Sequence, residues 1–276
     1  MSELRPVNKE DGICSILYRD WKVVQPKAVL LLIHGLGAHS ARWEFLSEFF
    51  LKYNISSYAI ELRGYGEAVA SKERPATLKT YFEDILRLYN IIKEENGSKK
   101  IFIVGESMGA VVSFLLTATR PELFEGLICI SPALKNAFKF TFFDYFKTLS
   151  PLLYNPDKLI TLPFDYIACT RDADYLKVIK EERCEVPRAT SRLLFDMLIS
   201  QLRCQMLKNK LKTPILFLIP GRDTIMVPEA SRVFFNGLRL EDKTLMEYPD
   251  MYHAISIDTD REEAFGDILK WLKNRI

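Results

Sequence analysis

The chain has 276 residues, 48% of them hydrophobic, which is enough to bury one substantial core and excludes a disordered chain. Its 38 basic and 36 acidic residues leave a formal net charge of +2 with no long run of one sign, so we expect no nucleic acid partner. The five cysteines are odd in number and form no CxxC pair, which disfavours a disulfide framework or a zinc site and indicates reduced thiols in a cytoplasmic protein.

The first segment, MSELRPVNKEDG, is polar and charged, whereas a signal peptide would carry an apolar stretch after a positive start. No apolar run further along approaches the roughly 18 residues of a membrane span. The sequence therefore predicts neither export nor integration into a membrane.

Several short apolar runs have the nearly continuous hydrophobicity of strands that are buried on both faces of a sheet. They cover residues 28–33, 58–60, 101–104, 127–130 and 215–219, and a further run at 245–248 predicts a last strand.

Helical patterns alternate with these runs. After the second run, Thr80 and Glu83 predict a capping box and Asn96-Gly97 predicts the end of a helix. Thr259 and Glu262 predict the start of a last helix in the same way. Strand and helix in alternation predict an open α/β sheet with helices on both faces.

Residues 134–211 interrupt the alternation. No buried strand is apparent there, and the pattern indicates several helices broken at Pro151, Pro156, Pro163 and Pro187. We therefore predict a helical cap over 134–211, inserted into an α/β core of residues 1–133 and 212–276.

The pentapeptide Gly105-Glu106-Ser107-Met108-Gly109 follows the strand pattern of residues 101–104 and precedes an apolar helical run. A G-x-S-x-G match alone arises by chance in about one chain in ten of this length. Between a buried strand and a helix, however, it has the context of a nucleophile elbow. Its glycines relieve crowding in the turn, and the helix start favours an oxyanion near Ser107.

A serine hydroxyl needs a base, and the chain has three histidines, each after a predicted strand. His34 and His39 belong to the early loop IHGLGAHS, whereas His253 alone lies late enough for the order serine, acid, histidine. Asp223 follows the strand of residues 215–219 and is the predicted acid that orients the histidine. Asp250 and Asp258 are the alternative acids, although we expect both to be solvated loop charges.

Two backbone N–H groups are predicted to form an oxyanion hole. One belongs to Met108, the residue after the serine, and the other to Leu36 in His34-Gly35-Leu36-Gly37. The alternative is that the glycines of this loop only make a turn.

These motifs together resemble the α/β-hydrolase superfamily, and within it the monoacylglycerol lipase and lysophospholipase group, also described as serine aminopeptidase-like hydrolases. The resemblance runs from about residue 27 to the end. It is carried by the segments HGLG at 34–37, ELRGYG at 61–66, GESMG at 105–109, GRD at 221–223 and YH at 252–253.

The resemblance implies an eight-stranded, mostly parallel sheet with a helical cap inserted after the sixth strand. It also implies hydrolysis of acyl esters through an acyl-serine, with no metal or organic cofactor. The roles it implies are Ser107 as nucleophile, Asp223 as acid, His253 as base, and the Leu36 and Met108 amides as oxyanion donors.

The sequence departs from the group at two places that bear on substrate preference. Arg63-Gly64-Tyr65-Gly66-Glu67-Ala68 stands where the group often has Arg-Gly-His-Gly-x-Ser, and Glu106 stands where it often has histidine. Neither departure removes a catalytic group.

The cap contains the densest aromatic and aliphatic stretch of the chain. Its aromatic residues are candidates to line an acyl channel or to touch a lipid surface, and the alternative is that they form the core of the cap. The candidates for substrate binding are Phe138, Phe142, Phe143 and Phe146, beside Phe140, Tyr145, Leu149, Leu152 and Leu153.

A mixed-charge run in the cap predicts a solvated helix face. An aminopeptidase-like hydrolase would instead use cap carboxylates to bind a substrate amine, and Glu181, Glu182 and Glu185 are the candidates.

We therefore predict a hydrolase that acts on small-molecule carboxylic esters with a medium or long acyl chain, such as monoacylglycerols or lysophospholipids. The alternatives are a short-chain esterase, a thioesterase, a proline-type aminopeptidase, and a scaffold protein without activity.

Overall fold

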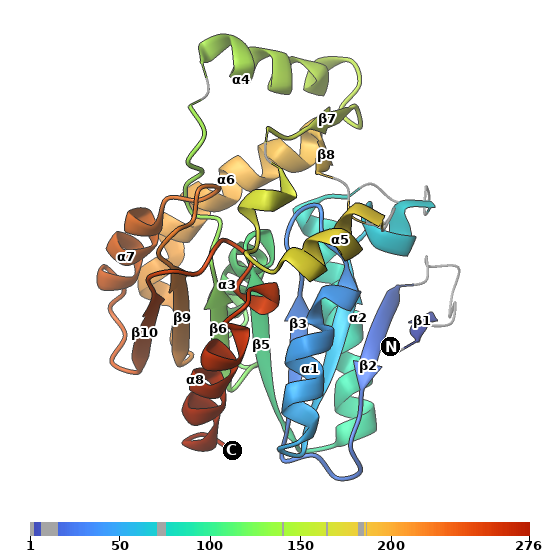
Figure 1. Ribbon diagram of the computed structural model, residues 1–276, viewed down its shortest axis with the longest axis vertical. Helices are drawn as coiled ribbons and strands as arrows, with labels where there is room; N and C mark the ends of the chain where they lie inside the picture. The colour runs from blue at the N-terminus through green and yellow to red at the C-terminus, as the bar shows by residue number, and fades with distance from the viewer. Residues whose placement is uncertain are drawn as a thin grey trace.

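The computed structural model describes residues 3–6, 16–70, 76–139, 141–163, 165–181, 185 and 187–276. An eight-stranded sheet forms its centre, in the order β1-β2-β4-β3-β5-β6-β9-β10 (Figure 1). The strands are β1 (Leu4–Pro6), β2 (Leu17–Trp21), β3 (Ala28–Ile33), β4 (Ile55–Glu61), β5 (Lys100–Glu106), β6 (Gly126–Ile130), β9 (Ile215–Pro220) and β10 (Lys243–Tyr248).

The sheet is mostly parallel, as predicted. Across the sheet from β4 through β3, β5, β6 and β9 to β10, every neighbouring pair of strands is parallel. Strand β2 is antiparallel to both β1 and β4. Every strand predicted from an apolar run is present. The prediction missed β1 and β2, because β2 carries Arg19 and Asp20 in its centre and β1 is only three residues long.

Helices cover both faces of the sheet, as the predicted α/β class requires. Alternate residues of β3 show the division, because Val29, Leu31 and Ile33 pack on one side while Ala28 and Leu30 pack on the other. On the first side lie α2 (Leu78–Asn96), α3 (Met108–Thr119) and α7 (Pro228–Asn236), and on the second lie α1 (Glu44–Leu51) and α8 (Arg261–Lys273).

Two predicted helix starts are wrong by a few residues. Helix α2 begins after Thr77, which forms the capping box with Thr80, so the box lies one turn before the predicted one. Helix α8 follows Asp260, which makes no side-chain cap. The predicted end of α2 is confirmed, because Gly97 is its C-cap with φ of 59°.

The segment predicted to form a cap, residues 134–211, runs between β6 and β9 and lies mainly above the sheet in Figure 1. It differs from the prediction in one respect, because two short antiparallel strands pair within it. Ala189 is the one buried residue of these two strands, and three residues each are too few to show the apolar pattern of the core strands. The elements are α4 (Phe142–Leu149), η3 (Ser150–Leu153), β7 (Leu159–Thr161), η4 (Tyr166–Ala168), α5 (Ala173–Glu181), β8 (Arg188–Thr190), α6 (Ser191–Leu207) and η5 (Lys208–Lys210).

Among the residues that the structure describes, no helix combines the length and apolar character needed to cross a membrane.

His34 ties together the loops that follow β3 and β4. Its Nδ1 donates to the Gly35 carbonyl at 2.8 Å, and its Nε2 accepts the Leu62 N–H at 3.0 Å. This pattern requires the neutral ring. Burial lowers the pKa of His34 from its usual 6.5 to about 3.

The folded protein holds His34 in its neutral form. The stability that the neutral His34 side chain contributes is therefore complete above pH 6.5 and is lost as the pH falls from 6.5 towards 3. We expect a His34→Gln variant to lose less stability on acidification than the wild type. Between pH 7 and pH 5 the difference between the two unfolding free energies should shrink by about 2 kcal/mol. Urea unfolding at both pH values measures this difference, and parallel pH profiles would contradict it.

Candidate active site

Ser107 occupies a sharp turn between β5 and α3. Its backbone has φ of 56° and ψ of −116°, a conformation that residues with a side chain rarely adopt. Its N–H donates to the Ile130 carbonyl of the neighbouring strand at 2.9 Å, which anchors the turn to the sheet.

The two glycines of the turn are required by close packing, as the sequence predicts. A Cβ at Gly105 would lie 2.2 Å from the Gly109 carbonyl oxygen, and a Cβ at Gly109 would lie 2.1 Å from the Ile33 carbonyl oxygen. Both contacts are with backbone, which cannot move aside as a flexible side chain can. The elbow therefore fits only if both positions lack a side chain.

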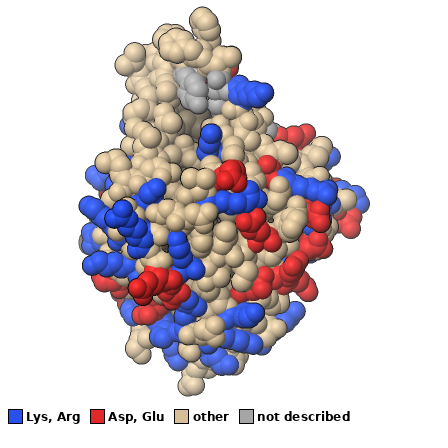
Figure 2. Space-filling view, turned by 90° about the vertical axis from the view of Figure 1, so that its left-hand side faces the viewer, with Lys and Arg blue, Asp and Glu red and all other residues tan. Residues whose placement is uncertain are grey.

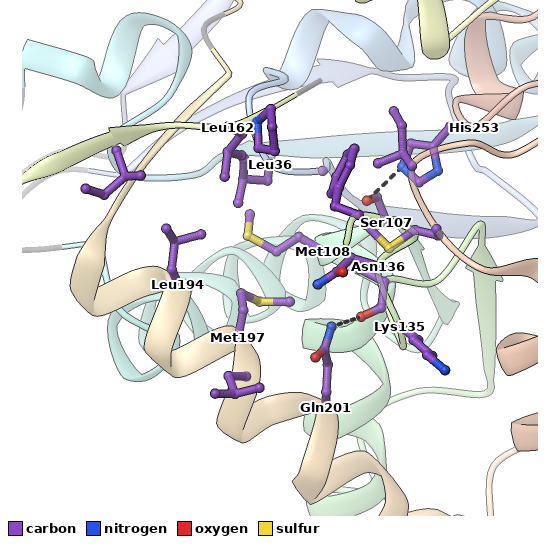
Figure 3. Close-up of a pocket in the computed structure, with 18 of the residues that line it drawn as sticks. Leu36, Ser107, Met108, Lys135, Asn136, Leu162, Leu194, Met197, Gln201 and His253 are labelled. Carbon is purple, nitrogen blue, oxygen red and sulfur yellow. Dashed lines mark hydrogen bonds between the residues drawn. The ribbon is translucent and has the colours of Figure 1, made fainter. Parts of the chain in front are cut away.

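Ser107, His253 and Asp223 form one hydrogen-bonded chain. The Ser107 Oγ lies 2.9 Å from His253 Nε2, and His253 Nδ1 lies 2.7 Å from Asp223 Oδ2 (Figure 3). The histidine and aspartate side chains are 7% and 2% exposed. The structure thus brings together the three residues that the sequence singled out, from loops that follow β5, β9 and β10.

The loop after β9 fixes the aspartate. Asp223 Oδ1 accepts the N–H groups of Ile225 and Met226, each at 2.8 Å, which leaves Oδ2 for the histidine. A carboxylate held in this way keeps the imidazole in the Nδ1–H tautomer, with Nε2 free to accept a proton.

The two alternative acids have other partners. Asp250 is exposed and pairs with Arg222, as expected of a loop charge. Asp258 is not the solvated charge that we predicted, because its side chain is fully buried and pairs with Arg171.

The predicted oxyanion donors line the same cavity as Ser107. Met108 is the first residue of α3, where backbone N–H groups have no partner inside the helix. Leu36 lies in the loop after β3, and this loop approaches the serine closely: a Cβ at Gly35 would lie 3.1 Å from the Ser107 Cβ. The loop is therefore more than a simple turn, since its backbone forms one wall of the site.

A cavity of about 630 Å³ opens beside Ser107 between the cap and the core. Much of its wall is apolar, and Figure 3 shows Leu194 and Met197 of α6 on one side and Leu36 and Leu162 on the other. Other lining residues carry polar groups: Arg42, Glu106 and Tyr166. Such a wall suits a ligand with a long apolar part and a compact polar part.

The cap aromatics differ from the prediction. Phe138 lines the cavity, but Phe142, Phe143 and Phe146 of α4 do not, and they are 81%, 79% and 63% exposed. Helix α4 places Asp144, Thr148 and Leu149 towards the cavity, so the helical period directs the three phenylalanines elsewhere. For these three, both the acyl-channel and the cap-core interpretations are therefore wrong. Phe140 and the side chain of Tyr145 lie outside the described residues.

Sequence reasoning missed an ion pair at the cavity wall. Arg42 Nε and Nη2 donate to the two carboxylate oxygens of Glu185, at 2.8 and 2.7 Å, and both residues are buried. The expected solvated face is therefore wrong for Glu185, although Glu181 is exposed as predicted. Glu182 lies outside the described residues. No periodic signal marks this pair, because its members are far apart in sequence.

Glu106, the departure beside Ser107, is also buried and bonded. Its carboxylate accepts the Ser256 N–H at 3.1 Å and the Ser256 hydroxyl at 2.8 Å. Burial raises the pKa of Glu106, and the nearby Arg42 and the Ser256 bonds oppose part of this rise. Among the described residues, no group of three or more His, Cys, Asp or Glu side chains is arranged to hold a metal ion.

Comparison with known proteins agrees with this geometry. Residues 24–260 match the family described as "Serine aminopeptidase, S33". The human monoglyceride lipase is 25% identical over 265 residues, which cover 93% of this chain and 86% of that protein.

Solved structures extend the comparison. A monoacylglycerol lipase from Paleococcus ferrophilus is 27% identical with a TM-score of 0.83, covering 95% of this chain and 99% of that one. A soluble variant of the Saccharomyces cerevisiae monoglyceride lipase, bound to a substrate analog, has a TM-score of 0.85 at 21% identity, covering 99% and 96%. The match over most of the chain, together with the sheet and the elbow, shows that the protein belongs to the serine aminopeptidase S33 family of α/β-hydrolases.

Proposed function

We propose that the protein hydrolyses carboxylic esters of the monoacylglycerol type through an acyl-serine intermediate. The observation that carries the proposal is the bonded chain of Ser107, His253 and Asp223 beside a largely apolar cavity. The names of the human and Paleococcus ferrophilus relatives support the ester class.

The first half of the reaction forms the acyl-serine. The Ser107 Oγ attacks the ester carbonyl as its proton passes to His253 Nε2, and Asp223 stabilises the resulting imidazolium. The oxyanion that develops is stabilised by the N–H groups of Leu36 and Met108. The imidazolium then protonates the leaving alcohol, and the carbon–oxygen bond of the ester breaks.

The second half releases the acid. His253 takes a proton from water, the hydroxide oxygen attacks the acyl carbon, and the same two N–H groups stabilise the second oxyanion. Collapse of this intermediate breaks the bond to the Ser107 Oγ, which regains its proton from His253.

The cavity wall supports the choice of substrate. An acyl chain fits against the apolar side chains from α6 and the loop after β7. The hydroxyl groups of a glycerol head find polar partners at Arg42, Glu106 and Tyr166, whose buried Oη has no hydrogen-bond partner among the described residues.

An aminopeptidase function is less well supported. Both oxygens of the Glu185 carboxylate are taken by Arg42, so this residue offers no free charge to a substrate ammonium.

We expect Ser107→Ala to abolish turnover of monoacylglycerols and p-nitrophenyl esters without unfolding the protein, because the turn stays intact while the attacking oxygen is gone. The measurement is hydrolysis together with labelling by a fluorophosphonate, which should modify the wild type at Ser107 and leave the variant unmodified. An exposed serine elsewhere in the labelled peptide map serves as the internal control. Retention of most activity in the variant would exclude this mechanism.

Acyl length should respond to the width of the cavity. We expect Leu194→Trp to lower kcat/KM for esters of twelve or more carbons by about tenfold, while esters of two to four carbons change little, because the larger ring fills space that only a long chain uses. Leu202→Trp is the matched control, since Leu202 lies on the same helix, is 57% exposed and does not line the cavity. Equal losses for short and long esters would contradict an acyl site at α6.

The outer face of α4 suits contact with a lipid surface. Phe142, Phe143 and Phe146 are exposed there, and Lys147 lies on the same helix. Figure 2 shows that the top of the molecule, where Figure 1 places α4, is mostly without charged side chains on this face. Helix α4 also lines the cavity, so a docked cap would bring the lipid close to the site.

We expect the double variant Phe142→Ser with Phe143→Ser to sediment less with vesicles of phosphatidylcholine and phosphatidylglycerol, and to hydrolyse a soluble short ester as the wild type does. Val233→Ser, which removes an exposed apolar residue from α7, is the control. Unchanged sedimentation of the double variant would show that α4 does not carry the contact.

A further inference from the structure

The segment that carries His253 is joined to the cap by a continuous seam. Four consecutive cap residues, Cys169 to Asp172, each bond to residues 254–261. The Cys169 carbonyl accepts the Ala254 N–H at 2.8 Å, and the Thr170 hydroxyl donates to the Ile257 carbonyl at 2.8 Å. Asp172 accepts from Arg261 at 2.8 Å.

Arg171 and Asp258 lie at the centre of this seam. Arg171 Nε donates to Asp258 Oδ1 at 2.9 Å, and Arg171 Nη2 bonds to the same oxygen. The Asp258 side chain is 0% exposed and that of Arg171 is 24% exposed, so the aspartate depends on the arginine for its counter-charge. Although burial acts to raise the pKa of Asp258, the bonds from Arg171 and Tyr252 hold this pKa below its usual value.

The second oxygen of Asp258 reaches the catalytic loop directly. Asp258 Oδ2 accepts the N–H of Tyr252, the residue before His253, at 3.2 Å. The same oxygen lies 3.4 Å from the N–H of Arg171. One buried carboxylate thus fixes both the cap segment at Arg171 and the backbone that leads into the histidine.

The cap side of the seam also faces the substrate cavity. Cys169 and Tyr166 line the cavity, and they lie two and five residues before Arg171 in the chain. A ligand in the cavity that displaces this part of the cap therefore also displaces the seam, and through the seam the loop that carries His253.

We propose that Asp258 and Arg171 are positioning residues that hold His253 in register with Ser107, and that they couple the placement of the cap to the placement of the base. This inference rests on the proposed function for its effect on rate. The seam itself is a matter of structure and can be tested without turnover.

The matched comparison is between two aspartates on the same loop. Asp258→Asn keeps the shape of the buried side chain but removes its charge, and Arg171→Gln weakens the same pair from its more exposed side. Asp250→Asn is the control, because Asp250 also pairs with an arginine yet is 63% exposed on the side chain. Each variant is purified as the full chain and used well below its melting temperature.

We expect Asp258→Asn and Arg171→Gln to lower kcat for a p-nitrophenyl ester about 10- to 100-fold while KM changes less than about threefold, because a small misplacement of the base affects the transition state more than binding. The double variant should lose little more than the stronger single variant, since both substitutions remove the ion pair between Arg171 and Asp258 and only Arg171→Gln also removes the contact with Asp260. Asp250→Asn should match the wild type. A kcat within about twofold of the wild type in both single variants would overturn the proposal.

Hydrogen–deuterium exchange provides the second readout, which does not depend on activity. Amides of residues 165–172 and of residues 251–257 should both exchange faster than in the wild type in each single variant. In Asp250→Asn the exchange rates of the same amides should be unchanged. If the wild type itself hydrolyses no ester, the proposed function fails, and the exchange result alone decides on the seam. Unchanged exchange in both segments would overturn the positioning role, whatever the activity.

Discussion

The close approach of backbone around Ser107 is the constraint on which the rest of the site depends. Gly105, Gly109 and the end of β3 meet at distances that leave no room for a single Cβ, and the serine accepts a left-handed conformation as a result. Such a turn persists only because β5 and α3 are buried in the central layers and hold it from both ends. The strain of one residue is thus supported by the packing of the whole sheet.

Much of the fold and the core of the site could be predicted from sequence, because both leave local signals. Strands buried on two faces appear as continuous apolar runs, and the elbow has a fixed spacing of glycines about the serine. The order of serine, acid and histidine then follows from the strand ends. The misses are features whose signal is not local. Strand β2 is near the sheet edge and is half polar, and the outward direction of Phe142 depends on how α4 sits over the cavity.

Buried charges were the other source of error, and for a related reason. Glu185 and Asp258 look like loop or surface charges in sequence, and each is buried only because an arginine from a distant segment meets it. Burying an unpaired carboxylate costs too much free energy, so each carboxylate is buried only when the fold brings its arginine into contact. Both pairs join the cap to the core, one between Arg42 and Glu185 and the other between Arg171 and Asp258.

The insertion point of the cap has a consequence for how this fold can vary. Strand β6 ends at Ile130 and β9 begins at Ile215, and these two strands pair directly in the sheet. From the point of view of the core, the whole cap is therefore one loop whose two ends are held together. The entropy of closing such a loop rises only with the logarithm of its length, by about 0.6 kcal/mol for each doubling. A cap can therefore grow, shrink or be exchanged with little effect on the folding of the strands beneath it. The same sheet can therefore carry a different cap, provided that the new cap again supplies a counter-charge to Asp258, the carboxylate buried in the segment after His253.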